Sequence, residues 1–71
     1  MKVLKLIYNE YTDRYEIDGR DLHCGTCFAV KLPNGSWKET RIEHGYIDDG
    51  QGWYLVGTPY QGYFAGLEVR W

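Results

Sequence analysis

The sequence predicts an all-β fold: a single small SH3-like or half-open barrel of five to six short antiparallel strands. Short segments in which apolar and polar residues alternate are typical of strands with one buried face. Nine glycines and several turn dipeptides separate these segments at close intervals. No segment has the i, i+3, i+4, i+7 apolar spacing of an amphipathic helix. With 71 residues, the chain is expected to form one domain, residues 1–71.

The first two expected strands form a hairpin. Residues 2–8 are rich in apolar and β-branched side chains, and residues 14–17 alternate between apolar and polar side chains. The polar residues 9–13 connect these two segments. Asp18-Gly19 follows the second strand, and this dipeptide is a strong turn signal.

The second expected hairpin joins residues 27–32 to residues 37–44. Asn34-Gly35 lies between these two segments. An Asn-Gly pair in this position favours a type I′ turn, because both central residues of that turn adopt positive φ. The sequence therefore predicts a tight hairpin here.

The rest of the chain is predicted to contain two strands and two loops. Residues 46–52 carry an Asp-Asp-Gly sequence and are expected to form a loop. Residues 53–56 and 67–71 are expected to be strands. Between them, residues 58–66 hold a proline and two glycines among aromatic side chains, which is typical of a surface loop.

Both cysteines lie in the sequence HCGTC at residues 23–27. A C-x-x-C supplies two zinc ligands, and His44 with a carboxylate could complete a site, but a second pair of ligands is missing from the sequence. A redox pair needs a helix N-terminus to lower a thiol pKa, and here a predicted strand follows. We therefore expect no metal and no cofactor. Zinc held by Cys24, Cys27 and His44 is the alternative.

A structural role for this segment is the favoured interpretation. Leu22 and one of the two cysteines are expected to pack into the core. The intervening Gly25 is expected to allow the bend that leads into the following strand.

The aromatic residues suggest a binding surface. Three Trp, seven Tyr and two Phe are more than a core of this size hides easily. Exposed aromatic side chains on small barrels stack on bases, hold Pro-rich peptides or contact protein partners. The loop at 58–66 is favoured because loops lie at the surface. The predicted binding residues are Trp37, Arg41, Tyr54, Tyr60, Tyr63 and Phe64.

Composition limits the class of function. A net charge of −2 argues against coating nucleic acid through phosphate neutralisation. No apolar run reaches the roughly 20 residues of a membrane span, and the first segment is too short and too interrupted for a signal peptide. We therefore expect a cytoplasmic protein without a membrane segment. No sequence motif of a known catalytic site is present, and we expect no enzyme.

Several segments, spread over nearly the whole chain, resemble a known family. They are YNE at 8–10, RYEI at 14–17, LHCG at 22–25, Trp37, TRIE at 40–43, GWYLVG at 52–57 and GLEVR at 66–70. This pattern is similar to a small domain-of-unknown-function family of low-GC Gram-positive bacteria, often carried on plasmids and integrative conjugative elements. The resemblance implies a compact β-domain and a mobile-element setting. It offers no functional residues to transfer.

The expected function is non-catalytic protein binding through exposed aromatic side chains, by a monomer or weak homodimer. One alternative is single-stranded nucleic-acid binding, in which Lys31, Lys38 and Arg41 contact phosphates while Trp37 or Tyr54 stacks on bases. Another is an acidic inhibitor, encoded by a mobile element, of a host nucleic-acid-binding protein. The sequence does not identify the protein partner.

Overall fold

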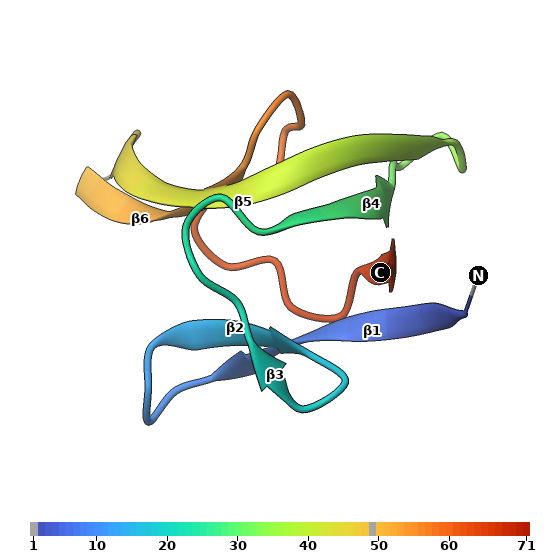
Figure 1. Cartoon of the computed structure of the whole chain (residues 1–71). Helices are drawn as coiled ribbons and strands as arrows, with labels where there is room; N and C mark the ends of the chain where they lie inside the picture. The colour runs from blue at the N-terminus through green and yellow to red at the C-terminus, as the bar shows by residue number, and fades with distance from the viewer. Residues whose placement is uncertain (1, 49) are drawn as a thin grey trace.

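The computed structural model describes residues 2–48 and 50–71 as one antiparallel sheet with the strand order β3-β2-β1-β7-β4-β5-β6. The strands are β1 (Val3–Asn9), β2 (Arg14–Ile17), β3 (Arg20–Asp21), β4 (Cys27–Lys31), β5 (Trp37–Ile47), β6 (Gly50–Leu55) and β7 (Glu68–Arg70). The sheet bends so that β1, β2 and β3 form one layer and β4, β5 and β6 face them (Figure 1). The short β7 pairs with β1 and β4 and so joins the layers.

The predicted all-β class and the unclosed sheet are confirmed. The sheet has seven strands rather than five or six. The additional strand, β3, is only two residues long, which is too short for any alternation to indicate it. None of the described residues forms a helix of the length and apolarity needed to cross a membrane.

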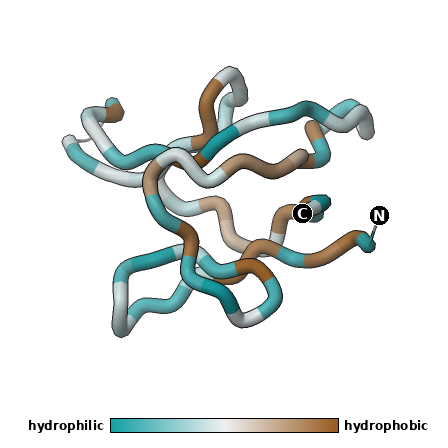
Figure 2. Tube along the Cα trace, viewed as in Figure 1, coloured by the Kyte–Doolittle hydropathy of each residue, from teal (hydrophilic) through white to brown (hydrophobic). Residues whose placement is uncertain are grey.

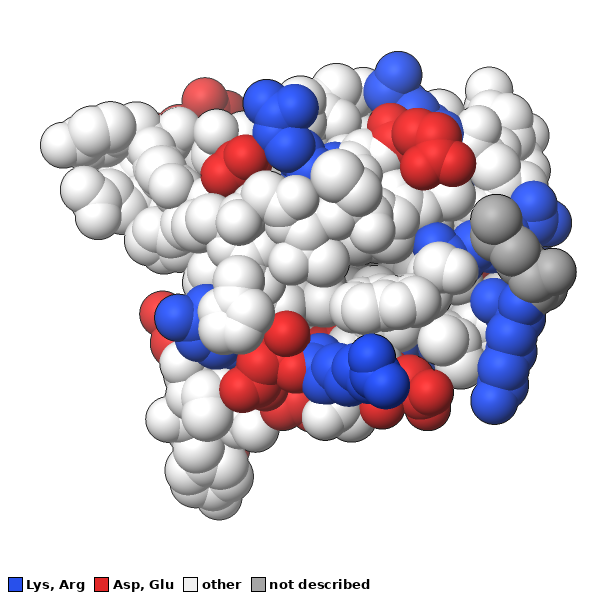
Figure 3. Space-filling model, in the orientation of Figure 1, with Lys and Arg blue, Asp and Glu red and all other residues white. Residues whose placement is uncertain are grey.

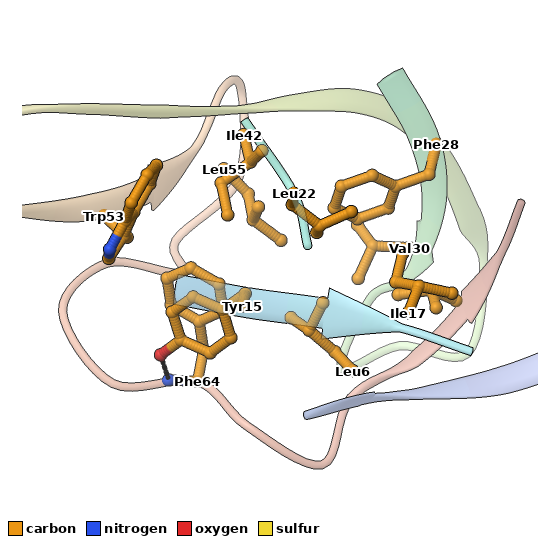
Figure 4. Close-up of a cluster of buried hydrophobic side chains, with 11 residues drawn as sticks. Leu6, Tyr15, Ile17, Leu22, Phe28, Val30, Ile42, Trp53, Leu55 and Phe64 are labelled. Carbon is orange, nitrogen blue, oxygen red and sulfur yellow. Dashed lines mark hydrogen bonds between the residues drawn. The ribbon is translucent and has the colours of Figure 1, made fainter. Parts of the chain in front are cut away.

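The core lies between the two layers (Figure 4). In β2, the polar Arg14 and Glu16 alternate with the buried Tyr15 and Ile17. β1 is apolar at most of its positions, as the tube in Figure 2 shows. Every layer contributes buried side chains: Leu6, Tyr15, Ile17, Leu22, Phe28, Val30, Ile42, Trp53, Leu55, Phe64 and Val69. Full burial of an aliphatic or aromatic side chain stabilises a fold by about 1.5–3 kcal/mol. This cluster is therefore the main source of stability in so short a chain.

The prediction of a loop at residues 46–52 is wrong. β5 and β6 continue as a regular hairpin, with register from Ile42↔Leu55 to Ile47↔Gly50. The alternation that marks the earlier strands is lost here because glycines and polar residues face solvent on both strands. The Asp49 part of that prediction lies outside the described residues.

A type I′ turn occurs in the hairpin between β2 and β3. Ile17 pairs with Arg20, so Asp18 and Gly19 are the two central residues, with φ of +54° and +77°. Two positive φ values are what this turn requires, and its twist matches the twist of the flanking strands. The strong turn signal of Asp-Gly is thereby confirmed.

The hairpin between β4 and β5 has a different turn from the one expected. Gly35 has φ of +89°, but Asn34 is not among the residues with positive φ. The Gly35 N–H donates to the carbonyl of Leu32 at 2.9 Å. Pro33 explains this geometry, because its fixed φ suits the first central position of a type I turn. The result is a three-residue loop that ends in a left-handed glycine.

The segment between β6 and β7 forms hydrogen bonds with the free edge of β6 and then with β1. It first follows β6. There the Leu55 N–H donates to the Tyr60 carbonyl at 3.0 Å, and the Gly62 N–H donates to the Trp53 carbonyl at 2.8 Å. It then crosses to β1, where the Gly66 N–H donates to the Leu6 carbonyl. These bonds satisfy backbone groups that an open sheet would otherwise leave exposed.

Tyr15 fastens this segment to the opposite layer. Its hydroxyl accepts a hydrogen bond from the Phe64 N–H at 2.8 Å and donates one to the Gly62 carbonyl at 3.1 Å. The Tyr15 and Phe64 rings stack with centroids 4.3 Å apart (Figure 4). A buried phenol with both hydrogen bonds made therefore holds the loop in place.

Candidate functional site

The most exposed aromatic side chains lie at one end of the molecule. Tyr11 is 93% exposed in the loop between β1 and β2, and Tyr46 is 85% exposed near the end of β5. Tyr63, in the loop that precedes β7, is 75% exposed. Two projections stand apart at this end in the space-filling view, with a notch between them (Figure 3). They correspond to the β1–β2 and β5–β6 hairpin tips (Figure 1).

The notch is a cleft, which we call the inter-hairpin cleft. Its main lining side chains are Tyr8, Asp13, His44, Ile47, Trp53 and Tyr63. A second depression shares Asp13, His44 and Trp53 with it and extends to His23 and Cys24. A third shares Tyr8 and Tyr63 and extends to Tyr11. The three depressions therefore form one continuous surface.

Aromatic contacts build the walls of the cleft. The Tyr8 ring meets the edge of Tyr63 with centroids 5.8 Å apart. On the opposite wall, the His44 ring meets Trp53 edge-on at 4.7 Å. Edge-to-face contacts of this kind are favourable and fix ring orientation. The cleft therefore presents aromatic rings that are already oriented.

Asp13 connects the two walls. Its side chain accepts a hydrogen bond from the Tyr8 hydroxyl at 2.5 Å, and its backbone carbonyl accepts one from Trp53 Nε1 at 2.9 Å. The bond to the Asp13 carboxylate is the main reason that the pKa of Tyr8 is raised to about 12. Asp13 has φ of +54°, a conformation that Asp tolerates better than most residues.

Two of the six predicted binding residues lie on the outer face of the sheet, away from the cleft. The Arg70 guanidinium lies over the Trp37 ring at 4.0 Å, so that ring is already covered on one side. Arg41 donates from Nε to Glu43 at 2.9 Å. Trp37 and Arg41 therefore already have partners within the chain, whereas the buried Arg70 Nε has no hydrogen-bond partner among the described residues.

Three more of the predicted residues are partly or wholly enclosed. Phe64 is only 6% exposed and packs on Tyr15, so the prediction that it is an exposed binding residue is corrected. Tyr60 is half-buried, and its hydroxyl donates to the Lys31 carbonyl at 3.2 Å. Tyr54 is half-buried and lies against the backbone of Gly45. Only Tyr63 of the predicted set lies in the cleft.

The HCGTC segment is a bend into β4. Leu22 is fully buried and Gly25 has φ of +90°, as expected. Both Cys24 and Cys27 are exposed free thiols, so the expectation of a buried cysteine is wrong. Among the described residues, His, Cys, Asp and Glu form no group of three that could hold a metal, so Cys24, Cys27 and His44 do not converge.

The sequence did not mark the cleft residues Tyr8 and Trp53. Both share strand parity with core residues, and alternation alone assigns them to the interior. For Tyr8, the relevant signal was the turn-rich segment that follows β1, because a strand that ends in a tip carries its last side chains to the rim. No such signal marks Trp53, which is only 7% exposed and lies at the boundary of the core.

Comparison with known proteins gives a family without a described activity. The pattern of a family described as a domain of unknown function, DUF5348, matches residues 4–71. The crystal structure of a protein from Ruminococcus gnavus is similar, with a TM-score of 0.71 and 37% identity, covering 99% of this chain and 100% of that one. No curated protein matches. The chain belongs to the DUF5348 family.

Proposed function

We propose that this protein is a non-catalytic protein-binding module and that the inter-hairpin cleft is its binding site. The observation that carries the proposal is that three tyrosines, each three-quarters or more exposed, lie at the same end of the fold. Tyr63 lines the cleft, Tyr11 lines the adjoining depression, and Tyr46 lies on the facing β5–β6 hairpin. Tyr and Trp dominate the energetically important residues of protein interfaces. A small domain gains nothing in stability from rings held in water, so a binding role accounts for their position.

The chemistry of the cleft supports binding rather than catalysis. Covalent catalysis requires a nucleophile within hydrogen-bonding reach of a base. In the described part of the chain, no side-chain hydrogen bond joins His23, His44 or Cys24 to an acid or a base. The Asp13 carboxylate accepts the Tyr8 hydroxyl through Oδ1, which gives that oxygen a structural role.

The outer face offers less support for the nucleic-acid alternative. Lys31 lies 3.8 Å from Glu68, and Arg41 is paired with Glu43. Phosphate binding needs cations whose charge is not already balanced. With Trp37 covered by Arg70, this face also has fewer free rings for base stacking.

A basic protein partner would suit the cleft, and this keeps part of the inhibitor hypothesis. The chain carries a net charge of −2. Opposite charge accelerates association and helps to exclude wrong partners. A cytoplasmic setting, carriage on a mobile element in low-GC Gram-positive bacteria, and a monomer or weak homodimer belong to the same proposal.

Site-specific photocrosslinking tests the proposal. Benzoylphenylalanine is placed at Tyr46 or Tyr63, and at the exposed Lys5 of β1 as a control on the opposite surface. The variants are expressed in the native host and irradiated. We expect discrete protein adducts from Tyr63 in the cleft and from Tyr46 on the β5–β6 hairpin beside it, and none from the control. The partner, once identified and purified, should bind the unmodified chain. Equal labelling at all three positions, or none, contradicts the proposal.

A further inference from the structure

The second half of β5 has an edge that no strand covers. β5 runs from Trp37 to Ile47, but its pairing with β4 ends at Cys27↔Arg41. Two more backbone hydrogen bonds follow. The Gly25 N–H donates to the Ile42 carbonyl at 2.8 Å, and the Ile42 N–H donates to the Thr26 carbonyl at 3.0 Å. Beyond this point the chain preceding β4 turns away at Gly25. On its other side, β5 stays paired with β6 to its end.

The geometry identifies which backbone groups are free. In an antiparallel sheet, successive residues direct their N–H and C=O groups to opposite sides. Both groups of Ile42 point to the β4 side, so those of His44 and Tyr46 do as well. Consistently, Arg41 accepts from the Val56 N–H on the β6 side. In the described ranges 2–48 and 50–71, no hydrogen bond satisfies the His44 and Tyr46 groups.

This edge lacks several of the features that usually protect an exposed strand. Natural sheets block their edges with proline, lysine, a bulge or a covering segment. The stretch from Glu43 to Ile47 contains neither proline nor lysine, and its register with β6 is regular. A depression lined by Asp13, Arg14 and Cys24 lies beside His44, so there is open space along the edge.

The charges beside this edge are mainly acidic. Glu10 and Asp13 lie on the β1–β2 tip, and Asp48 lies on the β5–β6 tip. The nearby cation, Arg14, is occupied: it donates to the Leu22 carbonyl at 3.2 Å and lies 5.8 Å from the Trp53 ring. Aromatic rings next to carboxylates favour a cationic side chain.

We propose that an extended peptide of a partner protein adds to the sheet as a strand beside His44 and Tyr46. The peptide main chain exchanges hydrogen bonds with the free groups of these two residues, as in other cases of strand addition. A lysine or arginine of the peptide reaches the Asp13 carboxylate and the neighbouring aromatic rings. This inference rests on the proposed protein-binding function and specifies how the cleft recognises its partner.

The test uses a phage-displayed library of random linear peptides, selected on the purified full chain. Selected peptides are resynthesised with single backbone N-methyl groups. We expect binding to fall by about tenfold or more when alternate residues are methylated, because each such change removes a main-chain hydrogen bond and adds bulk. Methylation at the intervening residues should have little effect. Hydrogen exchange should slow at the amides of His44 and Tyr46.

Two variants of the chain supply a matched comparison. Tyr46→Pro removes the free N–H without breaking a bond to β6, whereas Tyr46→Val removes the same ring and keeps the N–H. We expect Tyr46→Pro to weaken peptide binding several-fold more than Tyr46→Val. If Tyr46→Pro fails to fold, the N-methyl series still decides the question. Asp13→Asn should weaken the binding of peptides that carry lysine or arginine more than the binding of analogues that carry norleucine at the same position.

The outcomes separate this inference from the proposed function. Peptides that contact the cleft but tolerate methylation at every position, and that leave β5 exchange unchanged, overturn strand addition while the protein-binding cleft stands. If no peptide is selected and no partner crosslinks to the cleft, both ideas fail. Equal loss of binding in Tyr46→Pro and Tyr46→Val also contradicts strand addition.

Discussion

Tyr8 and Tyr15 face each other on neighbouring strands but differ in burial. They are paired in register, and their rings lie 5.1 Å apart on the same face of the sheet. Tyr15 is fully buried, with Phe64 stacked on it and both hydrogen bonds made inside the fold. Tyr8 is only partly buried: besides Tyr15, its ring meets Tyr63 edge-to-face, and its hydroxyl donates to Asp13 at the surface. The boundary between the core and the cleft therefore runs between these two rings.

The different burial of Tyr8 and Tyr15 is caused by the segment between β6 and β7. Tyr63 and Phe64 are adjacent in sequence, but Phe64 is 6% exposed and Tyr63 is 75% exposed. Phe64 covers the core over Tyr15, and Tyr63 forms a wall of the cleft over Tyr8. A single segment thus completes both the core and the candidate binding site. The predictions below test how far these two roles separate.

Tyr15 is expected to have the largest effect on stability. Tyr15→Ala should lower the free energy of unfolding by about 3–5 kcal/mol, because it leaves a cavity beneath Phe64. Tyr15→Phe should lower it by about 1–3 kcal/mol, since the Phe64 N–H then loses its acceptor. Urea denaturation measures both values. A Tyr15→Phe variant as stable as the parent would show that the hydroxyl does not hold the loop.

Trp53 is expected to have an intermediate effect. Trp53→Phe keeps an apolar ring in the wall but removes the donor to the Asp13 carbonyl, and should cost about 1–2 kcal/mol. Trp37→Phe on the outer face is the matched control, because no hydrogen bond from that indole is seen in the described chain; it should cost less than about 1 kcal/mol. Equal losses in the two variants would contradict the anchoring role of Trp53.

A substitution at Tyr63 should affect partner binding but not the stability of the fold. Tyr63→Ala should change the free energy of unfolding by less than about 1 kcal/mol, because the side chain is mainly in solvent. The same change should abolish crosslinking of a partner from position 46. A loss of stability as large as that of Tyr15→Phe would instead place Tyr63 in the core.

Tyr8 should lose its proton at a higher pH than an ordinary tyrosine. The carboxylate of Asp13 raises the pKa of Tyr8 from 10.0 to about 12, so folding favours the protonated phenol. The resulting contribution to stability is complete below pH 10 and is lost as the pH rises through about 12. NMR titration of the tyrosine ring carbons should give this midpoint, and Asp13→Asn should lower it towards the usual value. An unchanged midpoint in that variant would mean that the hydrogen bond is not made in solution.

Much of the fold could be predicted from alternation and turn chemistry. β2 was predicted at its observed bounds, and Asp18-Gly19 forms the turn that its sequence favours. The extension of β5 and β6 could not be predicted, because that hairpin lies mainly in solvent and no buried face imposes alternation on it. The type of turn at Asn34 was missed because Pro33 overrides the preference of Asn-Gly.

Less of the candidate site could be predicted. Tyr63 was identified from its loop, but the same reasoning selected its neighbour Phe64, which lies in the core. Trp37 and Arg41 were predicted as binding residues, and both lie on the outer face of the sheet. The sequence could not show that Arg70 and Glu43 already satisfy them.

By itself, the sequence determined the all-β class, most of the strand positions and the bend at Gly25, because these depend on residues close together in the chain. Only the tertiary structure decided which aromatic rings are buried and which are exposed. That choice depends on contacts between distant segments, such as Tyr15 with Phe64 and Trp53 with Asp13. The uncovered edge of β5 is likewise a tertiary property, since it depends on where β4 leaves its neighbour.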